Sequence, residues 1–296
     1  MILRHRDELE AVGPVAANVL RRHGLLWPFN AHFHSPLLDA AAGGSLLTGI
    51  GGDEVLGSSR WERVHRLIRG KVRPNLRDVG RLTVALSPAR LRAAVLRRRA
   101  PEPFPWLTEE GVARQRETWA RHAASEPVRR DRHTRWCLSL RYLSVGTTSL
   151  EKLAADARAA ILHPFLDPGF AFAVASIRPS SGADRRSAVL RDVCGDVLPE
   201  IVLTRNTKAS FDQAFWGASS RAFAADWDGT GIDAAVVDRE GLRHEWAKDV
   251  PDPHSLTLLQ SLWLRSAPPG QRAQDAATVS SKSSTAAFTE ESSRGR

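Results

Sequence analysis

Helical periodicity dominates the pattern of apolar and polar positions along this chain. Over residues 9–23 the apolar positions recur at helical spacing and Gly24 follows as a stop signal, which predicts an amphipathic helix that begins near Pro14. Three later stretches share this spacing: residues 108–125, 128–143 and 150–161. The sequence SVGTT at residues 144–148 predicts a turn between the last two helices.

A short strand interrupts this helical pattern. Residues 45–48 form a short, largely apolar run between the Gly43-Gly44 pair and Gly49, with helical patterns on both sides. Short apolar runs bounded by glycines and set between helices are typical of the buried strands of parallel α/β sheets. Only one or two such strands can be found, so we expect an α/β fold that is mostly helical.

Arginines punctuate the helical pattern between residues 60 and 100, where Pro74 and Pro88 separate three predicted helices. Beyond residue 266 the sequence becomes small and polar, with a single aromatic residue, and such a composition buries too little surface to offset the entropy of ordering. We therefore expect one ordered domain over residues 1–266 and a disordered tail over residues 267–296.

Composition narrows the expected location and partners. Hydrophobic residues make up 42% of the 296 positions, an ordinary globular share, and no apolar run approaches the roughly 18 residues that cross a bilayer. A cytoplasmic protein without a membrane partner is the expectation. The net charge of +9 comes mostly from arginine, but no nucleic-acid recognition motif or aromatic platform accompanies it, so nucleic acid is not an expected partner.

Cysteine and histidine provide no clear site of their own. Cys137 and Cys194 are the only cysteines, and we expect both to be reduced and mostly buried rather than nucleophilic. His32 and His34 have the alternate spacing of metal ligands, but no third ligand or carboxylate accompanies them. Packing within a loop is therefore the expected role of these histidines.

The residues after the predicted strand form a candidate ligand site. Gly49 and the Gly51-Gly52 pair predict a tight turn, after which Asp53 opens a helix. Ligands of α/β folds bind at the carboxyl ends of parallel strands, where glycines let backbone N–H groups approach an anion and a carboxylate can hold Mg²⁺ against phosphate oxygens. The alternative is that Asp53 is only a helix cap.

A longer string adds a family resemblance. T-G-x-G-G-D-E-x-x-G at residues 48–57 is similar to the S-G-x-G-A-D-E-x-x-G-G signature of asparagine synthase-like synthetases. The resemblance implies an adenine-nucleotide α-hydrolase-like fold (PP-loop ATP pyrophosphatase) with a parallel sheet and a large helical portion. It also implies an ATP- and Mg²⁺-dependent ligase that adenylates a carboxylate and passes it to an amine or ammonia.

The same resemblance assigns roles by position. Asp53 would position magnesium pyrophosphate, and Gly49, Gly51 and Gly52 would lie against the nucleotide. Ile50 stands where asparagine synthases have a glutamate tied to amide formation. This departure implies a substrate other than aspartate, as in the related β-lactam synthetases and lasso-peptide cyclases.

Residues 163–167 (HPFLD) resemble the family's E-V-R-x-P-F-L-D segment, with Ala160 and Leu162 in place of its glutamate and arginine. By their own chemistry, Pro164 ends a helix and Asp167 caps the next one, which favours a structural role.

Residues 187–211 resemble the family pattern in which L-P-x-x-V precedes an arginine, a lysine and an aromatic residue. By position, Arg205 and Lys208 inherit the catalytic roles, because a flexible ammonium can neutralise negative charge that develops on oxygen. The alternative for Lys208 is a solvated surface charge.

The S-G-G-x-D-S loop with which the family binds ATP is not found in this sequence. SGADRRS at residues 181–187 follows no clear strand and carries arginines where small residues are needed. The loop and a glutaminase domain are expected upstream of Met1, so the chain resembles a truncated synthetase domain whose strand with Leu46 and Leu47 exposes an edge.

Two roles therefore stay open. The first is an amide-forming ligase, incomplete or inactive alone, that acts on a carboxylate substrate once a partner chain completes the sheet or supplies the ATP loop. The second is a catalytically dead interaction module that assists an intact synthetase or docks to a biosynthetic partner through residues 60–99.

Overall fold

The computed structural model describes residues 9–57, 59–177, 190–192, 194–203 and 211–266. They fall into two compact units: unit 1 takes its residues from the ranges 1–35 and 210–296, and unit 2 from the range 36–209. The predicted tail and the candidates Arg205 and Lys208 lie outside the described residues. No described helix has both the length and the apolar character that a bilayer crossing needs.

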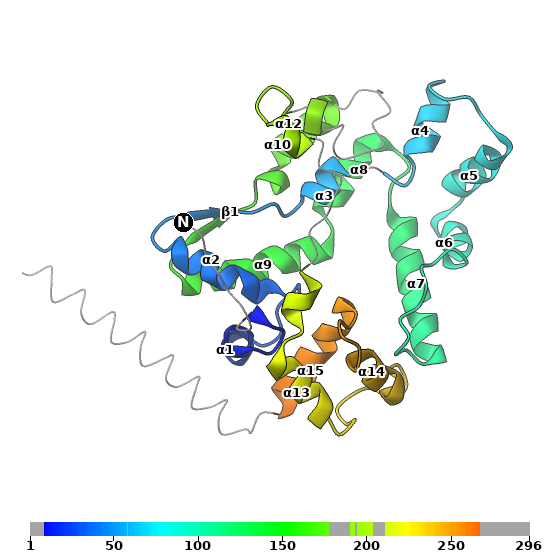
Figure 1. Ribbon diagram of the computed structural model, residues 1–296. Coiled ribbons are helices and arrows are strands. Elements are labelled where there is room, and N and C mark those ends of the chain that lie inside the picture. Colours follow the sequence, from blue (N-terminus) through cyan, green and yellow to red (C-terminus); the bar gives the residue numbers. More distant parts are fainter. Residues whose placement is uncertain (1–8, 58, 178–189, 193, 204–210, 267–296) are drawn as a thin grey trace, which may run out of the picture. The chain divides into compact units, whose positions relative to one another are not determined.

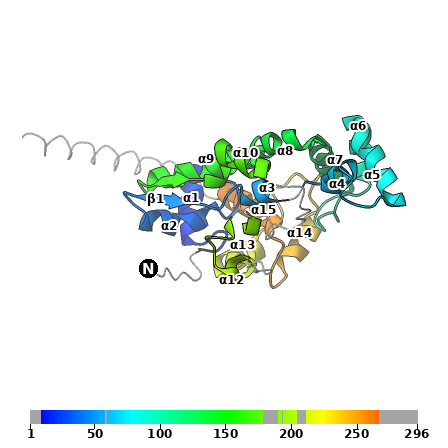
Figure 2. The same cartoon turned by 90° about the horizontal axis from the view of Figure 1, so that it is seen from above.

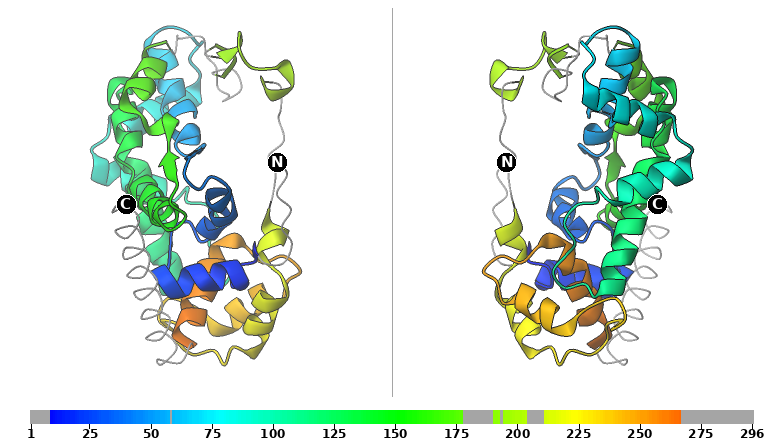
Figure 3. Two further views of the ribbon diagram at one scale, coloured as in Figure 1. Left: turned by 90° about the vertical axis from the view of Figure 1, so that its left-hand side faces the viewer. Right: turned by 90° about the vertical axis from the view of Figure 1, so that its right-hand side faces the viewer.

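Unit 1 consists of helices. They are α1 (Pro14–His23), α13 (Ala218–Asp226), α14 (Arg239–Trp246), α15 (Leu256–Ser266) and the short 3₁₀ helices Ala31–His34, Asp212–Phe215 and Pro253–Ser255. The predicted start and stop of α1 are confirmed, because Pro14 is its first residue and Gly24, with a φ of 72°, follows its last. Leu20 of α1 and Leu259 of α15 are buried, and Figure 3 shows the blue α1 beside the orange α15.

Buried polar contacts join the two sequence segments of unit 1. The Glu10 carboxylate accepts hydrogen bonds from the backbone N–H groups of Ser219 and Ser220, at 3.0 and 2.8 Å, in the first turn of α13. The Gln260 side-chain amide donates to the carbonyl oxygens of Ala11 and Phe29, both at 2.9 Å. Because buried polar groups need such partners, these contacts specify how the segments pair.

His32 lies in this polar core. Its side chain is buried and its Nε2 lies 2.8 Å from the carbonyl oxygen of Leu9, which confirms the expected packing role. Burial lowers the pKa of His32 below its ordinary value of 6.5, so the ring is neutral near pH 7.

This burial predicts a loss of stability in mild acid. The unfolded chain binds a proton at the ordinary pKa of 6.5 but the folded chain does not, so the free energy of unfolding falls as the pH drops below that value toward the folded pKa. The slope contributed by one histidine is at most about 1.4 kcal/mol per pH unit. Urea unfolding between pH 7.5 and 5 is expected to show a shallower decline in His32→Gln than in the matched control His34→Gln.

Unit 2 is mostly helical, with one small parallel sheet (Figure 1). Its first elements are α2 (Ser35–Ala40), β1 (Ser45–Leu47), α3 (Gly52–Leu56), α4 (Glu62–Ile68), α5 (Leu76–Leu86) and α6 (Ala89–Arg97). They are followed by α7 (Glu109–Ser125), α8 (Arg130–Leu138), α9 (Arg141–Asp156), β2 (Ala160–Leu162), a 3₁₀ helix (Pro164–Leu166), α10 (Pro168–Ile177) and α12 (Glu200–Leu203). The structure is thus compatible with the predicted α/β class.

The sheet pairs strands that lie far apart in the sequence. β1 and β2 run parallel, with Ser45 opposite Ala160 and Leu47 opposite Leu162. The prediction of a helix over residues 150–161 is therefore wrong at its end, because α9 stops at Asp156. Residues 160–162 form a strand because the ladder with β1 supplies backbone hydrogen bonds that local periodicity does not reveal.

The predicted turn at residues 144–148 is also wrong, because this segment lies inside α9. The hydroxyls of Ser144 and Ser149 donate to the carbonyl oxygens of Arg141 and Val145, at 2.9 and 2.8 Å, so they bond to the helix itself. Gly146 is buried within α9. The break between helices instead lies at residues 139–140.

The arginine-rich stretch forms the three helices that the sequence predicts, α4, α5 and α6, and α6 packs along α7. Figure 2 shows these helices gathered at one end of unit 2. Trp61, Val64 and Ala85 form a local apolar core beneath α4 and α5. We call the helices α4, α5, α6 and α7 the arginine lobe.

Candidate functional site

Two polar side chains meet at the carboxyl edge of the sheet. Thr48 follows β1 and His163 follows β2, so the parallel register brings them together, with Thr48 Oγ1 2.6 Å from His163 Nδ1. Burial lowers the pKa of His163, and its Nε2 is buried without a hydrogen-bond partner among the described residues. This edge is where α/β folds place their ligands.

The glycine turn packs directly on the HPFLD segment. Gly51 has a φ of 88°, and a Cβ on it would lie 2.3 Å from Leu166 Cδ2, while a Cβ on Gly52 would lie 3.5 Å from Phe165. Both glycines are buried, whereas Gly49 is exposed and its missing Cβ faces open space. Packing thus accounts for glycine at position 51, and Gly49 is the member of the turn that a ligand could approach.

Two carboxylates occupy the first turn of α3, immediately beyond the glycine turn. Asp53 is exposed, and the partly buried Glu54 accepts a hydrogen bond from the hydroxyl of Tyr142 on α9. Burial raises the pKa of Tyr142 well above its ordinary value, and the carboxylate of Glu54 raises it further, so the phenol stays a donor. Tyr142 is the only tyrosine of the chain, which is the single sequence signal that could have marked it.

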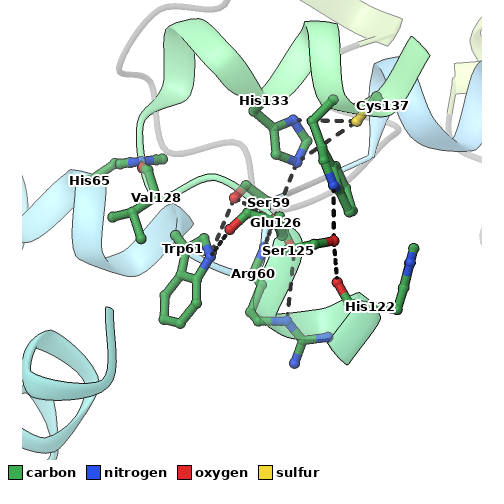
Figure 4. Close-up of polar contacts among 11 residues, drawn as sticks. Ser59, Arg60, Trp61, His65, His122, Ser125, Glu126, Val128, His133 and Cys137 are labelled. Carbon is green, nitrogen blue, oxygen red and sulfur yellow. Dashed lines mark hydrogen bonds and ion pairs between the residues drawn. The ribbon is translucent and has the colours of Figure 1, made fainter. Parts of the chain in front are cut away.

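A second network holds the chain just after α3 (Figure 4). The Glu126 carboxylate accepts hydrogen bonds from the Ser59 hydroxyl at 2.7 Å and from the Arg60 backbone N–H at 2.9 Å, and it lies 3.2 Å from His133 Nε2. Burial alone would raise the pKa of Glu126, but these contacts, led by His133, leave it below its ordinary value. Glu126 therefore connects the segment after α3 to His133 of α8. No local sequence motif identifies Glu126 as part of this network.

Cys137 lies at the far side of His133, with Sγ 3.5 Å from Nδ1. The order cysteine, histidine, carboxylate is that of a cysteine nucleophile with its base. Cys137 is only 3% exposed, however, and a buried thiol of this kind is inert toward substrates. Cys137 and Cys194 are not joined in a disulfide, as expected, and Cys137 is buried while Cys194 is partly buried.

The described residues around the glycine turn fit a magnesium ion held against phosphate. Mg²⁺ prefers oxygen ligands and is usually bound by one or two carboxylates together with substrate phosphates. Asp53 offers an exposed carboxylate four positions after Gly49, whose missing Cβ faces open space. Within the part of the chain that the structure describes, no three metal-ligating side chains gather at one point, so a cage made only of protein groups is not formed there.

Comparison with known proteins identifies the family. The family model for asparagine synthase matches residues 31–265, which include the glycine turn, Glu126 and His163. No curated protein and no solved structure matches the chain. The match covers most of the 296 residues, so the chain belongs to the asparagine synthase family of ATP-dependent amide-forming ligases.

Proposed function

We propose that this protein is the synthetase part of an amide-forming ligase, in which Mg·ATP activates a carboxylate that an amine or ammonia then attacks. The observation that carries the proposal is the exposed carboxylate of Asp53 at the carboxyl edge of the parallel sheet, within the family match. Asp53 would hold the magnesium ion of the pyrophosphate. Two contacts would position Asp53. Tyr142 donates a hydrogen bond to the neighbouring Glu54, and Leu166 packs against Gly51 in the turn before Asp53.

The proposed acyl substrate is a carboxylate other than aspartate. Ile50 occupies the position at which the resemblance to asparagine synthases expects a glutamate. An aliphatic side chain offers no hydrogen bond or charge there, so it cannot assist in the same way an amine that attacks the acyl group. Lys208 and Arg205 are proposed to neutralise the charge that develops on the acyl oxygen.

A partner polypeptide strand is also proposed, because the described sheet has apolar side chains that it does not cover. Leu47 on β1 is 67% exposed and its register partner Leu162 on β2 is 50% exposed. Parallel strands are ordinarily buried on both faces within larger sheets. Further strands would pair with the edges of this described sheet, the helices that connect them would cover these leucines, and one of the added segments could carry the ATP-binding loop.

Substitution of Asp53 tests the ligase proposal. Asp53→Asn keeps the shape of the side chain but removes its charge, so magnesium pyrophosphate is expected to bind at least about tenfold more weakly, as measured by calorimetry. Asp39→Asn, on the exposed face of α2, is the matched control and is expected to bind like the wild type.

The outcome also separates the two roles that the sequence leaves open. Equal binding by Asp53→Asn and the wild type would refute the assignment of Asp53. Absence of pyrophosphate and ATP binding by the wild type would contradict a ligase that acts by itself, and would favour the interaction module instead.

A further inference from the structure

A cavity of about 380 Å³ lies inside the arginine lobe, apart from the glycine turn. Four arginines and two tryptophans contribute to its wall: Arg60, Arg63, Arg81, Arg99, Trp61 and Trp119. They come from α4, α5, α7 and the segments next to α4 and α6. The remaining lining residues, from α4, α5 and α6, are aliphatic.

The guanidinium groups of this cavity outnumber the carboxylates that balance them. Asp78 is fully buried, and its carboxylate accepts hydrogen bonds from Arg63 at 2.6 and 2.7 Å and from Arg81 at 2.9 Å. One carboxylate therefore balances two guanidinium groups. Arg60 Nε lies 3.6 Å from the Glu126 carboxylate, which already accepts hydrogen bonds from the Ser59 hydroxyl and the Arg60 backbone N–H. Arg99 also lines the cavity, and its side chain is exposed.

The aromatic wall is held in place by its own contacts. The Arg60 guanidinium lies 5.2 Å from the ring centre of Trp119, and the Trp61 indole N–H donates to the carbonyl oxygen of Glu126 at 3.2 Å. Arg92 lies over the other indole, 5.6 Å from the ring centre of Trp61. A rigid aromatic and aliphatic wall beside a few charged groups is the usual construction of a small-molecule site, and the volume lies in the usual range of about 300 to 1,000 Å³.

We propose that the arginine lobe binds a small organic anion in this cavity, namely a carboxylate or phosphate attached to an apolar or aromatic body. Guanidinium forks match the paired oxygens of both groups, and the pair of hydrogen bonds from Arg63 to the two oxygens of the buried Asp78 is an example of that geometry. The exposed Arg99 in the cavity wall provides a positive charge that a ligand can neutralise. The cavity shares no residue with the glycine turn, so this site is independent of the proposed ligase chemistry.

Three probes distinguish the sources of the anion: indole-3-acetate as an aromatic carboxylate, adenosine monophosphate as an aromatic phosphate, and sulfate as a bare anion. Calorimetric titration of the full chain at low salt is expected to show one of the aromatic anions binding at least about tenfold more tightly than sulfate. Binding is expected to weaken as the ionic strength rises. Equal affinity for sulfate and both aromatic anions would overturn the requirement for an apolar body.

Charge reversal at the exposed Arg99 tests the location of the site. Arg99→Glu is expected to weaken binding of the preferred aromatic anion at least about tenfold, because it replaces an attractive charge with a repulsive one. Arg90→Glu, in the first turn of α6 and outside this cavity, is the matched control. Equal binding by both variants and the wild type would refute the proposed site.

A second variant tests whether the aromatic wall of the cavity contributes to binding. Trp119→Leu keeps every charge of the cavity and is expected to weaken the aromatic anion while leaving sulfate affinity unchanged. Asp53→Asn is expected to leave binding in the arginine lobe intact. Failure of the ligase proposal is thus distinguishable from failure of this one.

Discussion

Replacing Gly51 with alanine is expected to lower the free energy of unfolding by about 2 to 5 kcal/mol, the largest effect of a single methyl group in the candidate site. Two costs combine at this position. A residue with a side chain is strained at a φ of 88°, and the added Cβ would lie 2.3 Å from Leu166 Cδ2. Denaturant unfolding monitored by tryptophan fluorescence measures the loss.

Gly70→Ala is the matched control for this substitution. Gly70 has a φ of 65° but no atom within 4 Å of its missing Cβ, so only the backbone cost of about 1 kcal/mol applies. The double variant Gly51→Ala/Leu166→Ala is expected to recover part of the difference, because it removes the clashing methyl groups. A loss at Gly51 no larger than that at Gly70 would contradict the close approach of Leu166.

Replacing Glu126 with alanine is expected to destabilise the protein by about 3 to 5 kcal/mol. The substitution leaves the Ser59 hydroxyl, the Arg60 N–H and His133 without their shared acceptor in a site where the carboxylate is only 8% exposed. Buried donors that lose their acceptor cost far more than exposed ones. Glu117→Ala is the control, because Glu117 forms a helical pair with Arg121 on the surface and such a pair contributes less than about 1 kcal/mol.

The acid dependence of this effect provides a second readout. The pKa of Glu126 is below its ordinary value of 4.5 in the folded state, so its stabilisation is present above pH 4.5 and is lost as the pH falls through the folded pKa. The difference in unfolding free energy between Glu126→Ala and the wild type is therefore expected to shrink in acid. A difference that stays constant down to pH 3 would show that the carboxylate charge contributes nothing.

The Glu126 network also bears on the candidate site. Ser59 and Arg60 follow α3, whose first turn carries Asp53. The contacts of Glu126 with both residues and with His133 fix this connection against α8. If the proposed function holds, loss of this support displaces the carboxylate that positions the magnesium ion.

Local chemistry along the chain determined several features of the fold. Pro14 and Gly24 bound α1 as predicted, because a fixed φ suits the first turn of a helix and a positive φ suits the residue after it. Pro74 and Pro88 also precede helices, Pro74 one residue before the N-cap Asn75 of α5 and Pro88 as the N-cap of α6. The glycine turn and Asp53 stand at the end of β1 as the sequence indicates, and the family signature lies on the same residues.

Tertiary structure decided the rest, because the contacts concerned join residues far apart in the chain. β2 is a strand only through its ladder with β1, and no periodicity of its three residues distinguishes it from the end of a helix. Tyr142 reaches Glu54 across 88 positions of the sequence and His163 reaches Thr48 across 115. The sequence by itself thus determined the family, the helical character and the location of the candidate carboxylate, whereas only the packing of distant segments assembled that carboxylate's surroundings and the cavity of the arginine lobe.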